Sequence, residues 1–497
     1  MSTSDNIVRP VRLSRRSRQG IVLGLDGWQL SSLLAAFTCL FVALNQFGMP
    51  GVLYALPVVV PLAVAGVISI HGLSCPKIAG LWVLKHARHA IGATRTRFRP
   101  EAARLQGTIN LPGRAGVVQL WETPTVGVAY HPHERTVSIT AELEVQGFLM
   151  KDAGDRLDLS RQWASVLASF TQRPGIKRVT LQERTQPTTI RPARDTFEST
   201  ARRRGVASDA LPTVNYRDVL DIAEQFAVSH RNYLTLTFDL TVLGAQLRAL
   251  GGGKDAILAL ATVEGGNVSA ALRASKIAVR RWLNTREWAA LGRAIFDPEF
   301  LTAMHNRTGD LAGVDPAAIG PMALEEPRGR NGIVYTDSGV HTTLWIHEWP
   351  RTDAPVGFLE PVVFARHPVS NDAVAHVFTV VLTPVPVHKA LKRIRDEKRI
   401  WNGNQRMRAR RGQDGSISDE ADWLALEQQE EEIVSGHGEY RYGGYLTVTA
   451  RDERTLEQAV AGARNALLQQ GMEAQVLYCQ QAEALLVSAL PLGWGMK

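Results

Sequence analysis

Few residues in this 497-residue chain stand at spacings that support a known chemistry. A phosphate-binding loop needs Gly, four residues, Gly, Lys and then Ser or Thr. The nearest match is Gly253-Lys254, but Arg248 stands in place of the first Gly and Asp255 in place of the hydroxyl that would bind magnesium. A carboxylate at that place repels phosphate, so the sequence predicts no ATP hydrolysis by this chain.

Metal-ligand spacings are also incomplete. The His-Glu pair at 347–348 begins like a zinc-binding helix, but Pro350 ends that helix before a second His one turn later. The segment 131–134, His-Pro-His-Glu, precedes a predicted strand and is typical of a hairpin turn. We therefore expect no resident metal.

Nucleophile and dinucleotide motifs are broken in the same way. The Gly-His-Gly segment at 436–438 leads into a strand and has Arg441 in place of the last Gly, so it indicates a loop. A Gly-x-Ser-x-Gly elbow does not occur in the sequence. Cys39, Cys75 and Cys479 are far apart and show no catalytic or disulfide spacing. We expect no enzyme activity and no cofactor.

Charge is concentrated at one end of the chain. Residues 1–100 contain 11 Lys or Arg and two acids, whereas the remaining 397 residues contain 45 basic and 46 acidic side chains. The net charge of +8 therefore belongs to the first hundred residues. Because the bulk of the protein is nearly neutral, we expect no direct nucleic-acid binding.

The basic end contains a long apolar segment. No Asp, Glu, Lys or Arg occurs among the 50 residues from 27 to 76. A bilayer core needs about 20 apolar residues per helix, so we expect two spans, at 28–47 and 52–71, joined by a turn. Pro57 and Pro61 lie in the second span and predict a kink or close packing on the first. A buried soluble helical hairpin is the alternative.

The flanks of this segment predict its orientation. Five Arg precede it, and six Lys or Arg follow it before residue 100. Basic flanks favour the cytoplasm, so we expect a multi-pass plasma-membrane protein with both termini cytoplasmic. The stretch 77–93 has the pattern of a basic amphipathic helix on anionic lipid, with a plain helical linker as the alternative. The residues expected at the membrane interface are Arg15, Arg16, Arg18, Trp28, Lys77, Trp82, Lys85 and Arg88.

After about residue 110 the hydrophobic pattern becomes periodic. A half-buried strand is predicted at 137–145, followed by a helix with apolar residues from Leu159 to Phe170, which Pro174-Gly175 ends, and a second strand at 176–184. The almost wholly apolar stretch 374–382 predicts a central strand. Further strands are expected at 233–240, 340–349, 445–450 and 474–479, and helices over 268–288 and 455–470.

These elements predict an α+β fold. An N-terminal two-helix transmembrane hairpin precedes a cytosolic mixed α+β body of two related halves, with helices on one face of mostly antiparallel sheets. The predicted divisions are a basic cytosolic N-terminus (1–27), the hairpin (28–72), a basic juxtamembrane linker (73–109), a first half (110–310) and a second half (311–497).

The second half contains a charged insertion, at 388–434. Its first part, 388–411, has ten Lys or Arg and two acids, whereas 414–432 has eight acids and no base. Two helices folded back on each other would align these opposite charges. This helical arm is expected to be either a solvated hairpin or a docking element for a partner.

Several segments resemble a family of actinobacterial membrane proteins encoded in conjugation and type IV-like secretion gene clusters. The two most specific are Trp-Pro-Arg at 349–351 and Leu-Pro-Leu-Gly at 490–493. The matching segments are 15–19 with Gly24, 112–116, 136–147, 343–351 (Thr-Leu-Trp-Ile-His-Glu-Trp-Pro-Arg), 440–450 and 490–495.

This resemblance implies a non-catalytic inner-membrane component of a transfer channel. The body is similar in layout to the amino-terminal domain of the type IV secretion ATPase, preceded by a short two-span subunit and without the ATP-binding half. The implied role is to anchor or position a separate motor. The implied partners are membrane lipid, other secretion-channel subunits including a type IV secretion ATPase, and further copies of the chain.

Trp345, Trp349, Pro350 and Arg351 are candidate interface or structural residues, with core packing as the alternative for the tryptophans. Two other functions are kept open. The type VII secretion membrane component E also places a two-span hairpin before a cytosolic domain. From another class, the chain would be a membrane-tethered enzyme.

Overall fold

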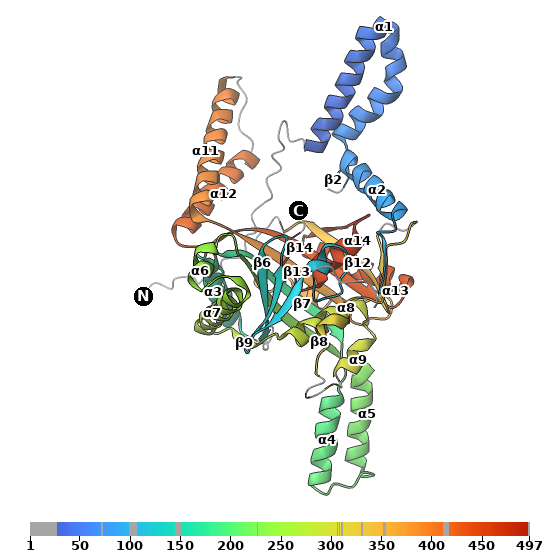
Figure 1. Cartoon of the computed structure of the whole chain (residues 1–497), viewed down its shortest axis with the longest axis vertical. Helices are drawn as coiled ribbons and strands as arrows, with labels where there is room; N and C mark the ends of the chain where they lie inside the picture. Colours follow the sequence, from blue (N-terminus) through green and yellow to red (C-terminus); the bar gives the residue numbers. More distant parts are fainter. Residues whose placement is uncertain are drawn as a thin grey trace.

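The computed structural model describes residues 27–70, 73–98, 107–144, 151–225, 227–305, 307, 309, 312–329, 332–350, 354–410 and 417–495. The architecture is α+β, as predicted: a long apolar helix near the N-terminus precedes a large antiparallel sheet with helices around it (Figure 1).

The helices in chain order are α1 (Gly27–Val67), α2 (Cys75–Ala90), α3 (Ala153–Thr171), α4 (Arg191–Arg203), α5 (Leu211–Gln225), α6 (Gly244–Ala249), α7 (Gly253–Ala274), α8 (Thr285–Phe296), α9 (Phe300–His305), α10 (Glu360–Val363), α11 (Val387–Arg410), α12 (Ile417–Val434), α13 (Glu453–Gln469) and α14 (Gln481–Ala489). Short 3-10 helices cover Gly113–Val117 and Pro316–Ala318.

The strands are β1 (Ser69–Ile70), β2 (Leu73–Ser74), β3 (Arg95–Arg97), β4 (Gln119–Glu122), β5 (Gly127–His131), β6 (Thr136–Glu144), β7 (Ile176–Pro187), β8 (Val228–Asp239), β9 (Ala278–Trp282), β10 (Ala323–Glu325), β11 (Val334–Tyr335), β12 (Val340–Glu348), β13 (His376–Val385), β14 (Glu439–Ala450) and β15 (Glu473–Val476). Strands β1 and β2 form a small separate hairpin sheet.

The other thirteen strands of the described chain form one sheet. Its order is β3-β10-β11-β12-β14-β13-β7-β8-β6-β5-β4, with β15 also paired to β12 and β9 to β6. The central pair, β13 and β7, is antiparallel and places Val380 opposite Leu181. The sheet therefore continues across the middle of the body, and the apolar stretch at 374–382 does form a central strand, as predicted.

The order of elements repeats along the body. The series β6, α3, β7, α4–α5, β8, α7, β9 is followed by β12, α10, β13, α11–α12, β14, α13, β15. In each series a helical hairpin connects the second strand to the third. The two hairpins project from opposite ends of the body, and α11–α12 lies on the same side as α1 (Figure 1). A domain boundary near residue 310 stays a prediction.

One face of the sheet is apolar. Ile139 on β6 packs in a buried cluster with Val268 of α7, and Leu446 on β14 packs in another with Leu456 of α13. Val380 contacts both clusters, so both lie on the same face. Burial of apolar area on this face is the main favourable contribution to the fold.

The opposite face is polar and also buried. Ser138 pairs with Thr237 at 2.9 Å between hydroxyl oxygens, and Thr140 pairs with Thr235 at 3.0 Å. The carbonyl of Leu492, in the segment after α14, accepts a hydrogen bond from Ser138 at 3.0 Å. The prediction that β6 is exposed on one side is wrong at these positions, because the segment after α14 covers its hydroxyl-bearing face and satisfies the buried hydroxyls. On this face the Gln182 amide also donates to the Ser488 carbonyl of α14 at 2.8 Å. Helices therefore cover both faces of the sheet, and the prediction that they cover one face is wrong.

The predicted helix at 268–288 is also wrong in part. Helix α7 ends at Ala274, strand β9 pairs with β6, and α8 begins at Thr285. Asn284 caps α8 by accepting the Glu287 N–H, and the Glu287 carboxylate accepts the Asn284 N–H in return. This capping box stabilises the N-terminus of α8, which is therefore a separate helix from α7.

Candidate membrane anchor and body surfaces

Helix α1 is an apolar element of 41 residues that folds back on itself. Gly48 has φ 61° and ψ −153°, outside the helical region and in a range of φ that favours glycine. The Ser32 hydroxyl donates to the Leu62 carbonyl at 2.7 Å, although the two residues are 30 positions apart. The parts of α1 before and after Gly48 therefore run side by side (Figure 1).

The outer surface of α1 is apolar and exposed. Phe47 is 71% exposed and Leu53 is 70% exposed. Other large exposed apolar side chains of α1 are Leu34, Phe37, Phe41, Val42, Leu44, Met49, Leu56, Val58, Val60, Val64 and Val67. Within the described chain, α1 is the one helix long and apolar enough to span a membrane. The structure thus has one helical element where the sequence predicts two separate helices.

Helix α2 connects α1 to the body through two cationic side chains, of which Lys85 is buried and Arg88 is partly buried. Lys85 is 1% exposed, and its Nζ donates to the Pro327 carbonyl at 2.9 Å. Arg88 donates to the Cys479 carbonyl at 2.5 Å. The expectation that Lys85 and Arg88 contact lipid is corrected, because both side chains point into the protein and bind backbone carbonyls there.

Glu326 is the acidic centre of this junction. It is 1% exposed, accepts the Gln481 N–H at 3.0 Å and lies 3.9 Å from the Arg88 guanidinium. Glu483 lies 3.6 Å from the other side of the same guanidinium. Burial raises the pKa of Glu326 above its ordinary value, although the Gln481 N–H, Arg88 and Lys85 act in the opposite direction.

The other predicted interface residues that the structure describes lie on α1 and α2. Trp28 is exposed at the start of α1, and Lys77 is half-buried near the start of α2. Trp82 is 50% exposed and contacts the His86 ring in a tilted arrangement with ring centroids 3.9 Å apart. Arg15, Arg16 and Arg18 lie outside the described residues.

The candidate segment around Trp345 lies at the end of β12. Trp345 packs against a buried cluster that contains Tyr445. Trp349 meets Tyr442 edge to face at 5.3 Å between centroids, and Pro350 is buried. These contacts give the tryptophans a packing role, the alternative considered from the sequence. Arg351 lies outside the described residues.

The charged arm forms a helical hairpin, as its sequence predicts. Lys398 of α11 pairs with Glu430 of α12 at 2.6 Å and lies 5.3 Å above the Trp423 ring. Trp401 contacts Trp423 in a tilted arrangement with ring centroids 4.5 Å apart. Opposite charges therefore face each other across the two helices, and an aromatic pair adds to the contact.

A second exposed apolar face lies on α5 and was not found from the sequence. Its side chains recur at helical spacing and are exposed: Leu211, Val214, Val219 and Ile222. On the inner side of this hairpin, Arg217 binds Glu198 and Arg194 binds Asp221, so α4 and α5 are joined by polar contacts. The stripe was visible in the sequence as apolar residues three to five positions apart.

A buried acid–base cluster also escaped the sequence reasoning. Glu183 on β7 accepts from Thr185 at 2.8 Å and from His230 on β8 at 3.2 Å, and lies 3.3 Å from the His376 ring on β13. Burial raises the pKa of Glu183, but the interactions with His230 and His376 outweigh it and hold the pKa below its ordinary value. The cluster joins three central strands.

Two residues of the incomplete motifs, Lys254 and His131, make structural contacts. Lys254 lies 5.2 Å above the Trp121 ring. His131 ends β5 and accepts the Glu134 N–H at 2.9 Å, which closes the predicted hairpin turn. Among the described residues, one group of three side chains could hold a metal ion: His347, Glu348 and Glu473.

No protein-family model matches this sequence, and no curated protein matches it either.

Proposed function

We propose that this chain is a non-catalytic membrane component of an actinobacterial conjugation or type IV-like secretion channel, where it anchors or positions a separate motor ATPase. The observation that carries the proposal is the exposed apolar surface of α1. Exposing so large an apolar surface to water is unfavourable, and a lipid bilayer would cover it. The assignment to a secretion channel rests on the resemblance of segments 343–351, 440–450 and 490–495 to the family described above.

The fold of α1 supports two crossings. A straight helix of 41 residues would be about 62 Å long, roughly twice the 30 Å thickness of the hydrocarbon core. Folded at Gly48, its two limbs are about 31 Å and 28 Å long, and each matches that thickness. The ends of α1 then lie on one side, and the basic flanks favour the cytoplasm.

Cysteine labelling tests this topology. Met49, at the fold of α1, is replaced with Cys in a chain whose Cys39, Cys75 and Cys479 are replaced with Ala. A membrane-impermeant maleimide should label Met49→Cys in intact cells. The matched variant Lys77→Cys should be labelled only after permeabilisation. Recovery of the protein in the soluble fraction without detergent, or labelling of Lys77→Cys in intact cells, contradicts the proposed arrangement.

The α5 face is the surface that we assign to the motor. It lies at the end of the body opposite α1 (Figure 1), so the lipid that surrounds α1 does not cover it. Its exposed stripe, which includes Val219 and Ile222, fits a protein partner with an apolar helix or sheet face.

Affinity purification from native membranes tests this assignment. The unchanged chain should recover a type IV secretion ATPase, and Val219→Asp with Ile222→Asp should lose most of it. Val263→Asp, at an exposed apolar position of α7, is the matched control and should retain the ATPase. Recovery of a type VII motor would favour component E instead. Equal recovery by the α5 variant would contradict the docking surface but leave the anchor proposal standing.

The purified chain should hydrolyse no ATP above background. Lys254 packs over Trp121 and has Asp255 beside it, an arrangement unsuited to phosphate. Turnover that Lys254→Ala removes would favour the tethered-enzyme alternative.

A further inference from the structure

The end of β12 contains a bulge that places neighbouring side chains close together. Pairing with β15 runs from Ile346 opposite Ala474 to Glu348 opposite Glu473, so His347 is an extra residue on β12. In a regular strand successive side chains point to opposite faces, whereas a bulge redirects one of them. The bulge explains how His347 and its neighbour Glu348 can both approach the same residue of β15.

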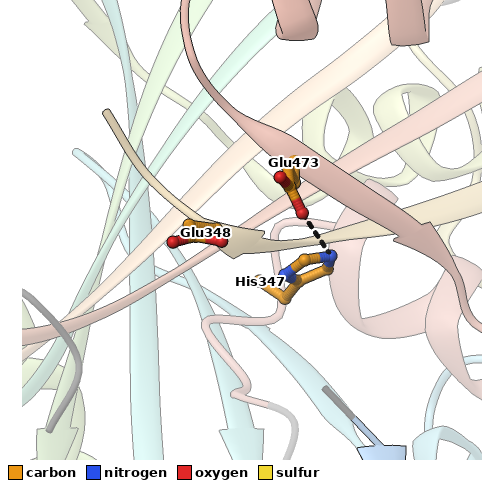
Figure 2. Close-up of side chains that lie close together, drawn as sticks. All are labelled: His347, Glu348 and Glu473. Atoms are coloured by element: carbon orange, nitrogen blue, oxygen red, sulfur yellow. Dashed lines mark ion pairs between the residues drawn. The ribbon is translucent and has the colours of Figure 1, made fainter. Parts of the chain in front are cut away.

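Figure 2 shows the His347 ring facing the Glu473 carboxylate across the two strands. The His347 Nε2 and Glu473 Oε2 atoms are 3.8 Å apart, and one ligand atom from each of the three residues lies within 4.8 Å of the others. The His347 side chain is 13% exposed and that of Glu473 is 55% exposed. The cluster is thus held by two paired strands on one side and is open to solvent on the other.

The distances between the ligand atoms, up to 4.8 Å, are longer than those in an occupied metal site. Ligand atoms at about 2.1 Å from a zinc ion are about 3.0–3.4 Å apart. Small rotations of the Glu348 and Glu473 side chains would close the remaining gap. Two carboxylates held this close repel each other, and a cation between them would offset that repulsion.

We propose that His347, Glu348 and Glu473 bind one divalent transition-metal cation of the zinc type. An imidazole nitrogen favours such metals over magnesium and calcium, which prefer oxygen ligands alone. Water completes the coordination on the exposed side. The bound cation joins β12 to β15, whose ligands are 125 positions apart (473 minus 348), and holds this edge of the sheet closed.

This site gives a role to the His-Glu part of segment 343–351, which the anchor and the motor surface do not use. It does not depend on the proposed secretion function, because the ligands belong to the body alone. The competing explanation is a simple ion pair between His347 and Glu473, which needs no metal.

Zinc titration separates the two explanations. The full-length chain in detergent is stripped with a chelator, dialysed and titrated with zinc chloride against a chromophoric competitor. We expect one zinc ion per chain. His347→Gln and Glu473→Gln should each weaken binding at least tenfold. His437→Gln, at an exposed turn after α12, is the matched control and should bind as the unchanged chain does.

A second measurement protects the test against misfolding. Zinc should raise the unfolding temperature of the unchanged chain and of His437→Gln, but not that of Glu473→Gln, whose exposed side chain is replaced without loss of volume. Failure of the folded, unchanged chain to bind zinc overturns the proposal. Equal affinity of the unchanged chain and both ligand variants also overturns it.

Discussion

Replacing Arg88 with Met should loosen the junction between α2 and the body. Met preserves most of the aliphatic volume but removes the guanidinium that bonds to the Cys479 carbonyl and lies 3.9 Å from Glu326. A hydrogen bond from a charged donor contributes about 1.5–3 kcal/mol. Breaking a fully buried ion pair costs about 3–5 kcal/mol.

The cost of breaking the Arg88–Glu326 ion pair is smaller than that of a fully buried pair, for two reasons. The Arg88 side chain is 20% exposed, and Glu326 retains the Gln481 N–H. We therefore expect the opening of α2 to become easier by about 3 kcal/mol in total, which corresponds to a roughly 100-fold loss of amide protection.

The loss of α2 protection in Arg88→Met should depend on pH. The pKa of Glu326 is raised by burial, so the stability linked to its protonation is present below the ordinary Glu pKa and is lost as pH rises through the raised value. Without Arg88 that pKa rises further. The deficit of Arg88→Met should therefore be larger at pH 7 than at pH 5.

Hydrogen–deuterium exchange of residues 75–90 measures this opening, after correction for the pH dependence of intrinsic exchange. The matched control is Arg95→Met, because Arg95 pairs with Glu325, the residue beside Glu326, on the exposed surface. Exposed pairs contribute little, so the control should leave α2 protection nearly unchanged. Equal protection of α2 in Arg88→Met and in the unchanged protein would refute the role assigned to this junction.

Two further predictions concern the anchor and the core. Phe37→Arg, near the middle of the first limb of α1, should oppose membrane insertion by about 3–4 kcal/mol, which lowers the insertion equilibrium constant roughly 100- to 1,000-fold. The fraction extracted by alkaline carbonate measures this change, and unchanged extraction would contradict the contact of Phe37 with lipid. His341 is fully buried between Thr336 and Thr449, which lowers its pKa to about 3. Its contribution to stability is present above pH 6.5 and is lost as pH falls, by about 2 kcal/mol between pH 7 and pH 5. His341→Gln should lack that part of the pH dependence in urea unfolding, and an identical dependence in both proteins would contradict a lowered pKa of His341 in the folded state.

Local patterns in the sequence predicted individual elements well. The alternation at 137–145 marked β6, the Pro174-Gly175 pair followed the end of α3, and the change from basic to acidic residues marked α11 and α12. Each of these signals lies within about one element of the chain, where side-chain periodicity reports burial directly. The order of the strands in the sheet has no such local signal.

Contacts between distant segments account for the errors. Ser138 and Thr140 look solvent-exposed by their polarity, but the chain that covers them is the segment around Leu492. Lys85 and Arg88 look like lipid contacts because the carbonyls that they bind, those of Pro327 and Cys479, lie more than 230 positions away. The proposed metal-binding cluster could not be found either, because Glu473 reaches His347 only through strand pairing.

The polar face of the sheet is covered by a segment that is synthesised long after the strands beneath it. The Ser138–Leu492 hydrogen bond joins residues 354 positions apart. At about 5–20 residues per second, a ribosome needs roughly 20–70 s to make the intervening chain. During that interval β6 and β8 have no permanent cover over their hydroxyl ladder. Until translation reaches the segment after α14, these hydroxyls would therefore hydrogen-bond to water, which the Leu492 carbonyl later replaces at Ser138.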